Sequence, residues 1–384
     1  MLALINPSPL SACLAGVELL RSDPTVTPIQ VVERMVSVLE DDPVTNAGYG
    51  SNLNLDGKVE CDASLMDGTT LGFGSIGSVS DFKNPIQVAA KVLQESDQGP
   101  LSLGRIPPLM LVGPGVAQWV DTMGYQLDRV ERNPNLASIL NDVTTANNPP
   151  SLVSKPALEQ YIHYNGLLMS TLTESSSSSK RKVDSTELDP NKKHANNSSE
   201  DSDMLNDTVG AICVDRLGRV AAGVSSGGIA LKFPGRVSEA ALFGAGCWAQ
   251  DPTHETAGLA CSVTGAGEQI TKTLLAKSCV ERLVDDDDTA SAAQKVLDRF
   301  IANPLLRSYK ERHAGFVALK IDPVEVSLSE EGAQHQSIRG EFVYGHTTPT
   351  MGIGYMSVQD SKPKVVMSQR KDGSKTTFTR AIKI

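Results

Sequence analysis

Thr208 lies in the sequence Asn206-Asp207-Thr208-Val209-Gly210-Ala211-Ile212, where a polar tract ends and an apolar, β-type run begins. Cleavage of the Asp207–Thr208 bond would give Thr208 a free α-amine beside its hydroxyl. These two groups form a nucleophile–base pair, and a threonine at a new N-terminus is a known variant of nucleophilic catalysis. The amine has an ordinary pKa of about 7.7–8.0, so it can accept a proton close to neutral pH. The alternative is that Thr208 simply opens a strand, for which threonine is well suited.

Three glycine-containing turns downstream of Thr208 carry further groups that this chemistry needs. They are Ser225-Ser226-Gly227-Gly228, Pro234-Gly235-Arg236-Val237 and Val263-Thr264-Gly265-Ala266-Gly267-Glu268. An arginine held by a turn can bind a carboxylate with two parallel hydrogen bonds. A hydroxyl, an amine, oxyanion donors and a carboxylate-binding arginine together indicate hydrolysis of an amide beside an acidic side chain.

Other motifs indicate chemistry less strongly. Gly72-Phe73-Gly74-Ser75-Ile76-Gly77 matches G-x-G-x-x-G, but no clear strand–turn–helix context surrounds it, so we expect no dinucleotide cofactor there. His346 is either a general base or, as is more common for a single histidine at a strand–turn junction, a structural residue. The chain has no HExxH motif and no paired-histidine or His/Cys cluster, so we expect no catalytic metal and no cofactor.

Composition narrows the function classes. The 384 residues suffice for one large domain or two ordinary ones, and the net charge of −10 argues against nonspecific binding to nucleic acid or to an anionic membrane. Six widely separated cysteines form no C-x-x-C pair, which favours free thiols over disulfides or zinc.

The elements that must position these groups follow from periodicity and turn signals. Thr27 as N-cap and Pro28 in the first turn predict a helix that continues to Leu39. Strands are expected at 209–214 and 220–224 around the turn Asp215-Arg216-Leu217-Gly218. Further helices are expected near 115–123, 134–143, 268–283 and 291–301, and further strands at 315–321, 341–344 and 352–358. This order predicts a layered α/β sandwich.

Residues 172–206 are polar and low in complexity, and we expect them to be disordered. Two basic clusters lie in this linker: Lys180, Arg181 and Lys182, then Lys192 and Lys193. Their spacing is typical of a bipartite nuclear-import signal that binds importin. The alternative is a solvated linker whose charges keep it extended.

Several stretches together resemble the asparaginase-type N-terminal-nucleophile hydrolases and, within them, the taspase branch (threonine aspartases). The stretches are Leu39-Glu40-Asp41-Asp42-Pro43 with Thr45-Asn46-Ala47-Gly48, Ser51-Asn52-Leu53-Asn54, Cys61-Asp62-Ala63-Ser64-Leu65-Met66-Asp67-Gly68, Asp207-Thr208-Val209-Gly210-Ala211, Ser225-Ser226-Gly227-Gly228 with Pro234-Gly235-Arg236-Val237, and Thr264-Gly265-Ala266-Gly267-Glu268. Gly104-Arg105-Ile106-Pro107-Pro108, His346-Thr347-Thr348, Gly354-Tyr355-Met356-Ser357 and the long basic linker favour the taspase branch.

The resemblance implies a single domain over 1–384 with the four-layer αββα sandwich of this family. Cleavage between Asp207 and Thr208 would give an α subunit, 1–207, that carries the linker, and a β subunit, 208–384. The subunits would stay together and pair as an (αβ)2 assembly. The taspase branch implies an endopeptidase that cuts after Asp in nuclear regulatory proteins, with the enzyme itself in the nucleus and cytoplasm.

The resemblance also implies roles for individual residues. Thr208 corresponds to the nucleophile, and Ser226 to a hydroxyl that positions it. Thr264 and Gly265 correspond to the loop that contacts substrate and oxyanion, and Asn46 to an amide of the oxyanion hole. The substrate-binding pair would be Arg236, which receives a carboxylate, and Glu239. The loop over residues 39–49 resembles a sodium-binding loop of some relatives, where the ion would be structural.

Two departures from the family pattern shape the expectations. The family begins with a strand that ends in a His-Gly/Ala-Gly-Ala-Gly type loop. This sequence has no such loop, so we expect either that the strand is missing or that the sequence is incomplete. Glu239 stands where small asparaginases place an Asp that holds the substrate's α-ammonium group. Two alternatives to the endopeptidase therefore stay open: a small-substrate asparaginase or isoaspartyl peptidase of the same fold, and an inactive truncated scaffold.

Overall fold

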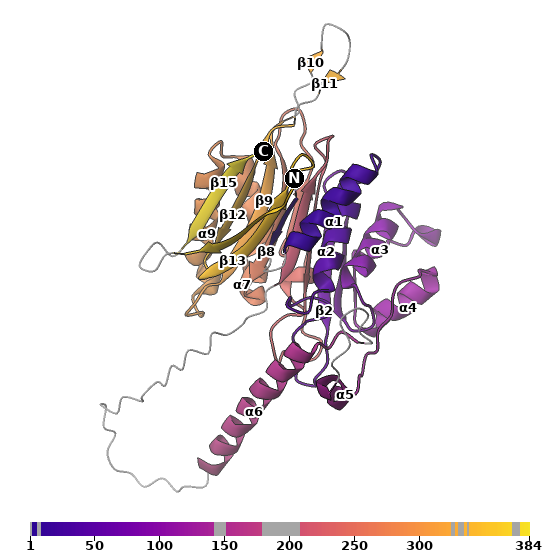
Figure 1. Cartoon of the computed structure of the whole chain (residues 1–384), viewed down its shortest axis with the longest axis vertical. Helices are drawn as coiled ribbons and strands as arrows, with labels where there is room; N and C mark the ends of the chain where they lie inside the picture. Colours follow the sequence, from indigo (N-terminus) through magenta and orange to yellow (C-terminus); the bar gives the residue numbers. More distant parts are fainter. Residues whose placement is uncertain are drawn as a thin grey trace, which may run out of the picture.

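The computed structural model describes residues 2–5, 9–141, 151–178, 208–323, 327–328, 334–335, 338–370 and 377–384. These residues form two β-sheets that face each other, with helices on the outer face of each (Figure 1). The expected layered α/β sandwich is therefore observed. None of the helices in the described ranges combines the length and the hydropathy that crossing a membrane requires.

The first sheet has eight strands in the order β14-β13-β1-β5-β6-β2-β3-β4. Their bounds are β1 Leu2–Ile5, β2 Cys61–Asp67, β3 Phe73–Val79, β4 Met110–Val112, β5 Val209–Val214, β6 Val220–Ser226, β13 Thr350–Met356 and β14 Lys364–Gln369. The second sheet has five strands in the order β15-β12-β9-β8-β7. Their bounds are β7 Cys247–Gln250, β8 Gly258–Gly265, β9 Ala314–Ile321, β12 Gly340–His346 and β15 Phe378–Lys383. A separate two-stranded ribbon joins β10 (Ser327–Leu328) and β11 (Gln334–His335).

The prediction that the first strand is absent was wrong. Strand β1 lies between β5 and β13 and pairs antiparallel with both, so that Leu2 is opposite Cys213 on one side and Met356 on the other. The prediction rested on the missing glycine-rich loop, whereas strand pairing requires only an extended backbone whose N–H and C=O groups face a neighbour. Because β1 fills this position, β5 and β13 are not left as open sheet edges.

Helices cover the outer faces of the two sheets. Helices α1 (Pro9–Ser22), α2 (Pro28–Glu40) and α3 (Pro85–Asp97) pack on the first sheet, and α8 (Leu275–Val284) and α9 (Thr289–Ile301) pack on the second. The remaining helices are α4 Pro114–Met123, α5 Leu136–Asn141, α6 Lys155–Ser178 and α7 Gly267–Thr273, with short 3-10 turns η1 Ser102–Gly104, η2 Glu239–Ala241 and η3 Pro304–Leu306. Apolar side chains of both sheets fill the space between them.

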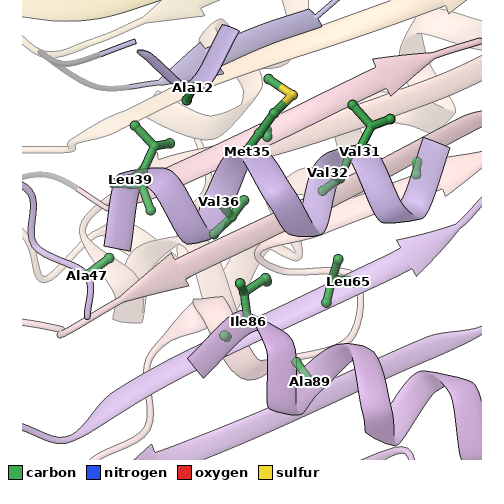
Figure 2. Packing of buried hydrophobic residues seen from close by; sticks show 14 of the residues in the cluster. Ala12, Val31, Val32, Met35, Val36, Leu39, Ala47, Leu65, Ile86 and Ala89 are labelled. Atoms are coloured by element: carbon green, nitrogen blue, oxygen red, sulfur yellow. The ribbon is translucent and has the colours of Figure 1, made fainter. Parts of the chain in front are cut away.

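Helix α2 shows how the sequence builds one of these layers. Pro28 occupies its first turn, and Gln30 accepts a hydrogen bond from the backbone nitrogen of Thr27 at 2.9 Å, as in a capping box. Val32 and Val36 point towards Leu65 of β2 and Ile86 of α3, while Met35 points to the other side of the helix, where Ala12 of α1 lies (Figure 2). Each side chain of this size contributes about 1.5–3 kcal/mol when it is fully buried.

Two local expectations are corrected, and one is refined. The helix expected over 268–283 is two helices, α7 and α8, because Leu274 between them has a left-handed backbone with φ of 45°. The G-x-G-x-x-G segment, of which all but Gly72 lies in strand β3, is not a turn before a helix, in line with the context that the sequence lacked. Helix α6 continues to Ser178, so the first residues of the expected disordered linker are helical, and the remainder of that linker lies outside the described residues.

Candidate active site

Thr208 is placed by the hairpin of β5 and β6. Asp215 accepts hydrogen bonds at its Oδ1 from the backbone nitrogens of Leu217 and Arg219, which closes the predicted turn between the strands. The antiparallel register puts Val209 opposite Ser225, so the next pair towards the hairpin's open end is Thr208 and Ser226.

The two hydroxyls of that pair touch. Thr208 is 6% exposed, and its hydroxyl donates to Ser226 Oγ at 2.9 Å. Ser226 Oγ also accepts from the backbone nitrogen of Gly228 at 3.0 Å. This fixes the position of Ser226 and, through it, that of the Thr208 oxygen. The expected proximity of Thr208 and Ser226 is therefore present.

A buried carboxyl stands on the other side of the Thr208 hydroxyl. Glu239 Oε1 lies 3.4 Å from Thr208 Oγ1, and the Glu239 side chain is almost fully buried. Burial raises the pKa of Glu239 to about 7, against the lowering effect of Arg236. Glu239 opens turn η2, whose N-cap Ser238 is fixed because its backbone nitrogen donates to Asp62 Oδ2 at 2.7 Å.

Arg236 is held by one carboxylate and keeps part of its guanidinium available. Its Nε and Nη2 donate to Glu268 Oε1 at 2.9 and 2.7 Å. Its Nη1 is buried and, within the described part of the chain, makes no hydrogen bond. A buried donor without a partner costs about 1–3 kcal/mol or more when it is charged, so an incoming carboxylate would relieve that cost. The absence of a side chain at Gly267 leaves room for the Arg236 guanidinium, because a Cβ there would be 2.8 Å from Arg236 Nη2.

Asn46 connects its loop to the end of β6. Its Nδ2 donates to the carbonyl of Gly228 at 2.8 Å, and its backbone carbonyl accepts from the nitrogen of Gly227 at 2.7 Å. Asn52 donates to the same Gly228 carbonyl at 2.9 Å. The Asn46 amide has two protons, and the second one is not used by that bond. Its oxyanion role stays a prediction.

One cavity of about 650 Å³ collects most of the predicted site. The predicted site residues on its wall are Asn46, Thr208, Ser226, Arg236, Glu239 and Gly265. Thr264 precedes Gly265 in β8, and its hydroxyl is buried without a hydrogen-bond partner among the described residues. Asp207 lies outside the described residues.

Sequence reasoning missed one whole wall of this cavity. Helix α6 contributes Gln160, Tyr164, Leu167, Leu168 and Thr171, and the loop before β9 contributes His313. The first turns of α6 pack on the segment of Leu53 and Val59, while its later turns extend away from the sheets (Figure 1). The available signal was the run of apolar residues from Leu167 to Met169 directly before the polar linker.

His346 is a structural residue in this fold. It is fully buried and is not on the cavity wall. One ring nitrogen, Nδ1, is 2.8 Å from the carbonyl of Thr348, and Nε2 is 2.8 Å from Ser368 Oγ. Burial lowers the pKa of His346. Both nitrogens are therefore engaged away from Thr208.

Two kinds of metal site can be compared with the described residues: a cluster of side-chain ligands and the expected sodium loop. No group of three or more His, Cys, Asp or Glu side chains in those residues could hold a metal ion. In the loop expected to bind sodium, the Thr45 hydroxyl is 2.8 Å from the carbonyl of Leu39, 3.1 Å from that of Asp42 and 3.3 Å from that of Ala47. Convergent carbonyl oxygens suit a hard cation, but a hydroxyl already lies among them. The sodium site stays a prediction.

Comparison with known proteins identifies the family. The sequence model of the family described as asparaginase (Asparaginase_2) matches residues 9–133 and 154–320. A plant-type L-asparaginase of Pyrococcus horikoshii is 33% identical over 267 residues, which cover 69% of this chain and 70% of that protein. An isoaspartyl peptidase/L-asparaginase of Mus musculus is 29% identical over 270 residues, 70% of this chain and 64% of that protein. An isoaspartyl peptidase of Salmonella typhimurium is 32% identical over 248 residues, 65% of this chain and 62% of that protein. The chain therefore belongs to the asparaginase family of N-terminal-nucleophile hydrolases.

Proposed function

We propose that this chain is a self-cleaving threonine endopeptidase that hydrolyses peptide bonds after Asp. The observation that carries the proposal is the contact of the Thr208 and Ser226 hydroxyls in a cavity where Arg236 Nη1 has no hydrogen-bond partner among the described residues. Cleavage of the Asp207–Thr208 bond would add the amine that completes the nucleophile–base pair.

The reaction follows from these positions. The Thr208 amine accepts the proton of its own hydroxyl as Oγ1 attacks the carbonyl carbon of the substrate Asp. Arg236 Nη1 binds that aspartate's side-chain carboxylate and so selects the residue before the scissile bond. The tetrahedral intermediate collapses to an ester on Thr208 as the proton passes to the leaving amine. Water then hydrolyses the ester and restores the hydroxyl.

The size and wall of the cavity favour a peptide over a free amino acid. Ligand pockets of about 300–1,000 Å³ suit molecules far larger than asparagine. The cavity here has about 650 Å³, and half-exposed Leu167 of α6 lines one side of it. An apolar wall beyond the carboxylate-binding end can receive the side chains that flank Asp in a polypeptide.

A second candidate function is that of an asparaginase or isoaspartyl peptidase. Two observations favour it. The relatives reported above carry those names, and Glu239 lies close enough to Arg236 that the arginine lowers the pKa of its carboxyl. A carboxylate beside an arginine could hold the α-ammonium and α-carboxylate of a free aspartyl group. The third hypothesis, a scaffold inactive for want of its first strand, loses its premise because β1 is present.

Three substrates separate the two candidates. Purified wild-type protein is incubated with a peptide that contains an internal Asp-Gly bond, with L-asparagine and with a β-aspartyl dipeptide, and Thr208→Ala serves as the control. The proposal expects Thr208-dependent cleavage of the peptide at a kcat/KM well above that of either small substrate. Turnover of the small substrates alone would instead support the second candidate.

The assembly and the cellular site also belong to this proposal. We expect the fragments to remain associated as (αβ)2, and the protein to reach nuclear substrates from the cytoplasm through importin. The basic residues that would bind importin, Lys180 to Lys182 with Lys192 and Lys193, lie outside the described residues. Their substitution by alanine in a fluorescently tagged full chain should remove nuclear accumulation.

A further inference from the structure

Self-cleavage raises a problem that turnover does not. In the uncleaved chain the nitrogen of Thr208 is part of a peptide bond, so it has no basic lone pair and cannot accept the hydroxyl proton. Another group must therefore act as base in the first reaction of this site. This question rests on the proposed function, since it supposes that the Asp207–Thr208 bond is cut by Thr208.

Two side-chain oxygens lie within hydrogen-bonding distance of Thr208 Oγ1 among the described residues. They are Ser226 Oγ at 2.9 Å and Glu239 Oε1 at 3.4 Å. A neutral hydroxyl is a very weak base, whereas a carboxylate accepts protons readily near neutral pH. Glu239 is therefore the stronger acceptor of the two.

The hydroxyl protons can be arranged so that they lead towards Glu239. Ser226 Oγ already accepts the Gly228 nitrogen proton. Hydroxyl groups rotate to suit their partners, so Ser226 can donate to Thr208 Oγ1 across their 2.9 Å contact. The proton of Thr208 is then free to point at Glu239 Oε1. In this arrangement Ser226 orients the Thr208 oxygen and Glu239 receives its proton.

The surroundings of Glu239 suit a base that works near neutral pH. Arg236 lies close to it and favours its charged form, while Asp62 on β2 and Glu268 on α7 favour its neutral form. Asp62 is itself fully engaged, because its two oxygens accept from the backbone nitrogens of Ser78 and Ser238. With burial as the largest effect, the pKa of Glu239 is about 7. General bases are most effective when their pKa lies near the working pH.

We propose that Glu239 is the general base of self-cleavage, acting on the Thr208 hydroxyl before the Thr208 amine exists. The Glu239 carboxylate takes the hydroxyl proton as Thr208 Oγ1 bonds to the carbonyl carbon of Asp207. The tetrahedral intermediate then breaks the bond between that carbon and the Thr208 nitrogen, and Glu239 returns the proton to this nitrogen. The product is an ester between Asp207 and Thr208, which water hydrolyses to a free Asp207 carboxylate and the Thr208 hydroxyl. The new amine then takes over as base for substrates.

The test measures self-cleavage of the full chain over time by denaturing gel and mass spectrometry, from pH 5 to 9. Glu239→Gln keeps the shape of the side chain and removes its basicity, and it should slow cleavage by about 100-fold or more. Glu33→Gln is the matched control, because Glu33 is another carboxyl of raised pKa, on α2 and away from the cavity. The wild-type rate should rise with pH through about 7 and then level off, since only the carboxylate form of Glu239 accepts a proton.

A second variant guards against misfolding. Glu239→Ala leaves a space beside Thr208, and added formate should enter it and restore part of the cleavage rate, which a purely structural role would not allow. The inference is overturned if Glu239→Gln cleaves at the wild-type rate with the wild-type pH profile. It is also overturned if both variants are slow, formate has no effect and the pH inflection near 7 persists. Failure of the proposed function looks different, because wild type itself would then stay uncleaved.

Discussion

At the end of strand β6, each face of the sheet carries a serine beside a buried glutamate, but the two pairs serve different purposes. On one face, Ser225 Oγ donates to Glu40 Oε1 at 2.6 Å, and on the other, Ser226 Oγ meets the Thr208 hydroxyl beside Glu239. Both carboxyls are buried, and burial raises the pKa of Glu40 to about 8 and that of Glu239 to about 7. Successive side chains of a strand point to opposite faces, which separates the two pairs.

The partners of the two carboxyls explain what each face does. Glu40 also accepts from the backbone nitrogen of Ile86 at 3.0 Å, so its carboxyl links α2, α3 and β6 inside the core. Glu239 faces a hydroxyl and a cavity wide enough for a substrate. The Ser225–Glu40 pair thus stabilises the fold. The Ser226–Glu239 pair lies beside the Thr208 hydroxyl, whose proton must move in the proposed reaction.

The largest expected effect is the loss of activity on substitution of Thr208, which belongs to the cavity face. Thr208→Ala should abolish both self-cleavage and turnover, because it removes the hydroxyl that the account assigns as the nucleophile. The midpoint of thermal unfolding should change little, since the substitution removes only a hydroxyl and one methyl group from the residue that precedes β5. Gel analysis of self-cleavage and a melting curve check the two halves of this prediction.

The paired serines give a reciprocal test. Ser226→Ala should lower kcat by about 100-fold, because Thr208 loses the contact that orients it. Ser225→Ala should instead cost about 1–3 kcal/mol of unfolding free energy, because Glu40 loses its donor inside the core. Urea unfolding and kinetics of both variants are the measurements. Equal losses of activity in the two would contradict the division between the faces.

A smaller effect should follow from Arg236→Lys. A lysine cannot donate from two fixed directions, so it could not hold Glu268 and a substrate carboxylate as the guanidinium does. Losing one charge-assisted hydrogen bond costs about 1.5–3 kcal/mol, which raises KM about 10- to 100-fold. Steady-state kinetics on the Asp-Gly peptide check this, and a fall in kcat with an unchanged KM would assign Arg236 a different role.

The smallest effect is a pH dependence of stability from the core face. The pKa of Glu40 is raised in the folded state, so folding favours its protonated form, and stability falls as the pH rises from about 5 towards about 8. The slope from one such group is at most about 1.4 kcal/mol for each pH unit. Glu40→Gln should flatten this dependence in urea titrations at pH 6 and 7, and an unchanged slope would count against a buried neutral Glu40.

The parts of the site that could be predicted are those determined by local features of the sequence. The Asp215–Gly218 turn fixes the β5–β6 register, and that register alone sets Thr208 against Ser226. Glu239 and Arg236 are three residues apart, so their proximity also follows from the chain. The contact of Glu239 with Thr208 could not be read in this way, because it depends on how Asp62 of β2 holds the residue before Glu239.

The elements that were missed have weaker local signals or none. Strand β1 has four residues and is recognisable only through its partners β5 and β13. The break at Leu274 requires a left-handed backbone at a residue that usually continues a helix. Helix α6 forms one cavity wall through packing of its first turns on Leu53 and Val59, which no periodicity in its own sequence indicates.

The intact mass of purified wild-type protein, with the N-terminal sequence of any fragment, tests the central claim most directly. The account predicts two fragments that remain associated, 1–207 and 208–384, the second beginning Thr208-Val209-Gly210-Ala211. A single uncleaved chain after prolonged incubation at neutral and mildly alkaline pH would contradict the assignment of Thr208 as the nucleophile.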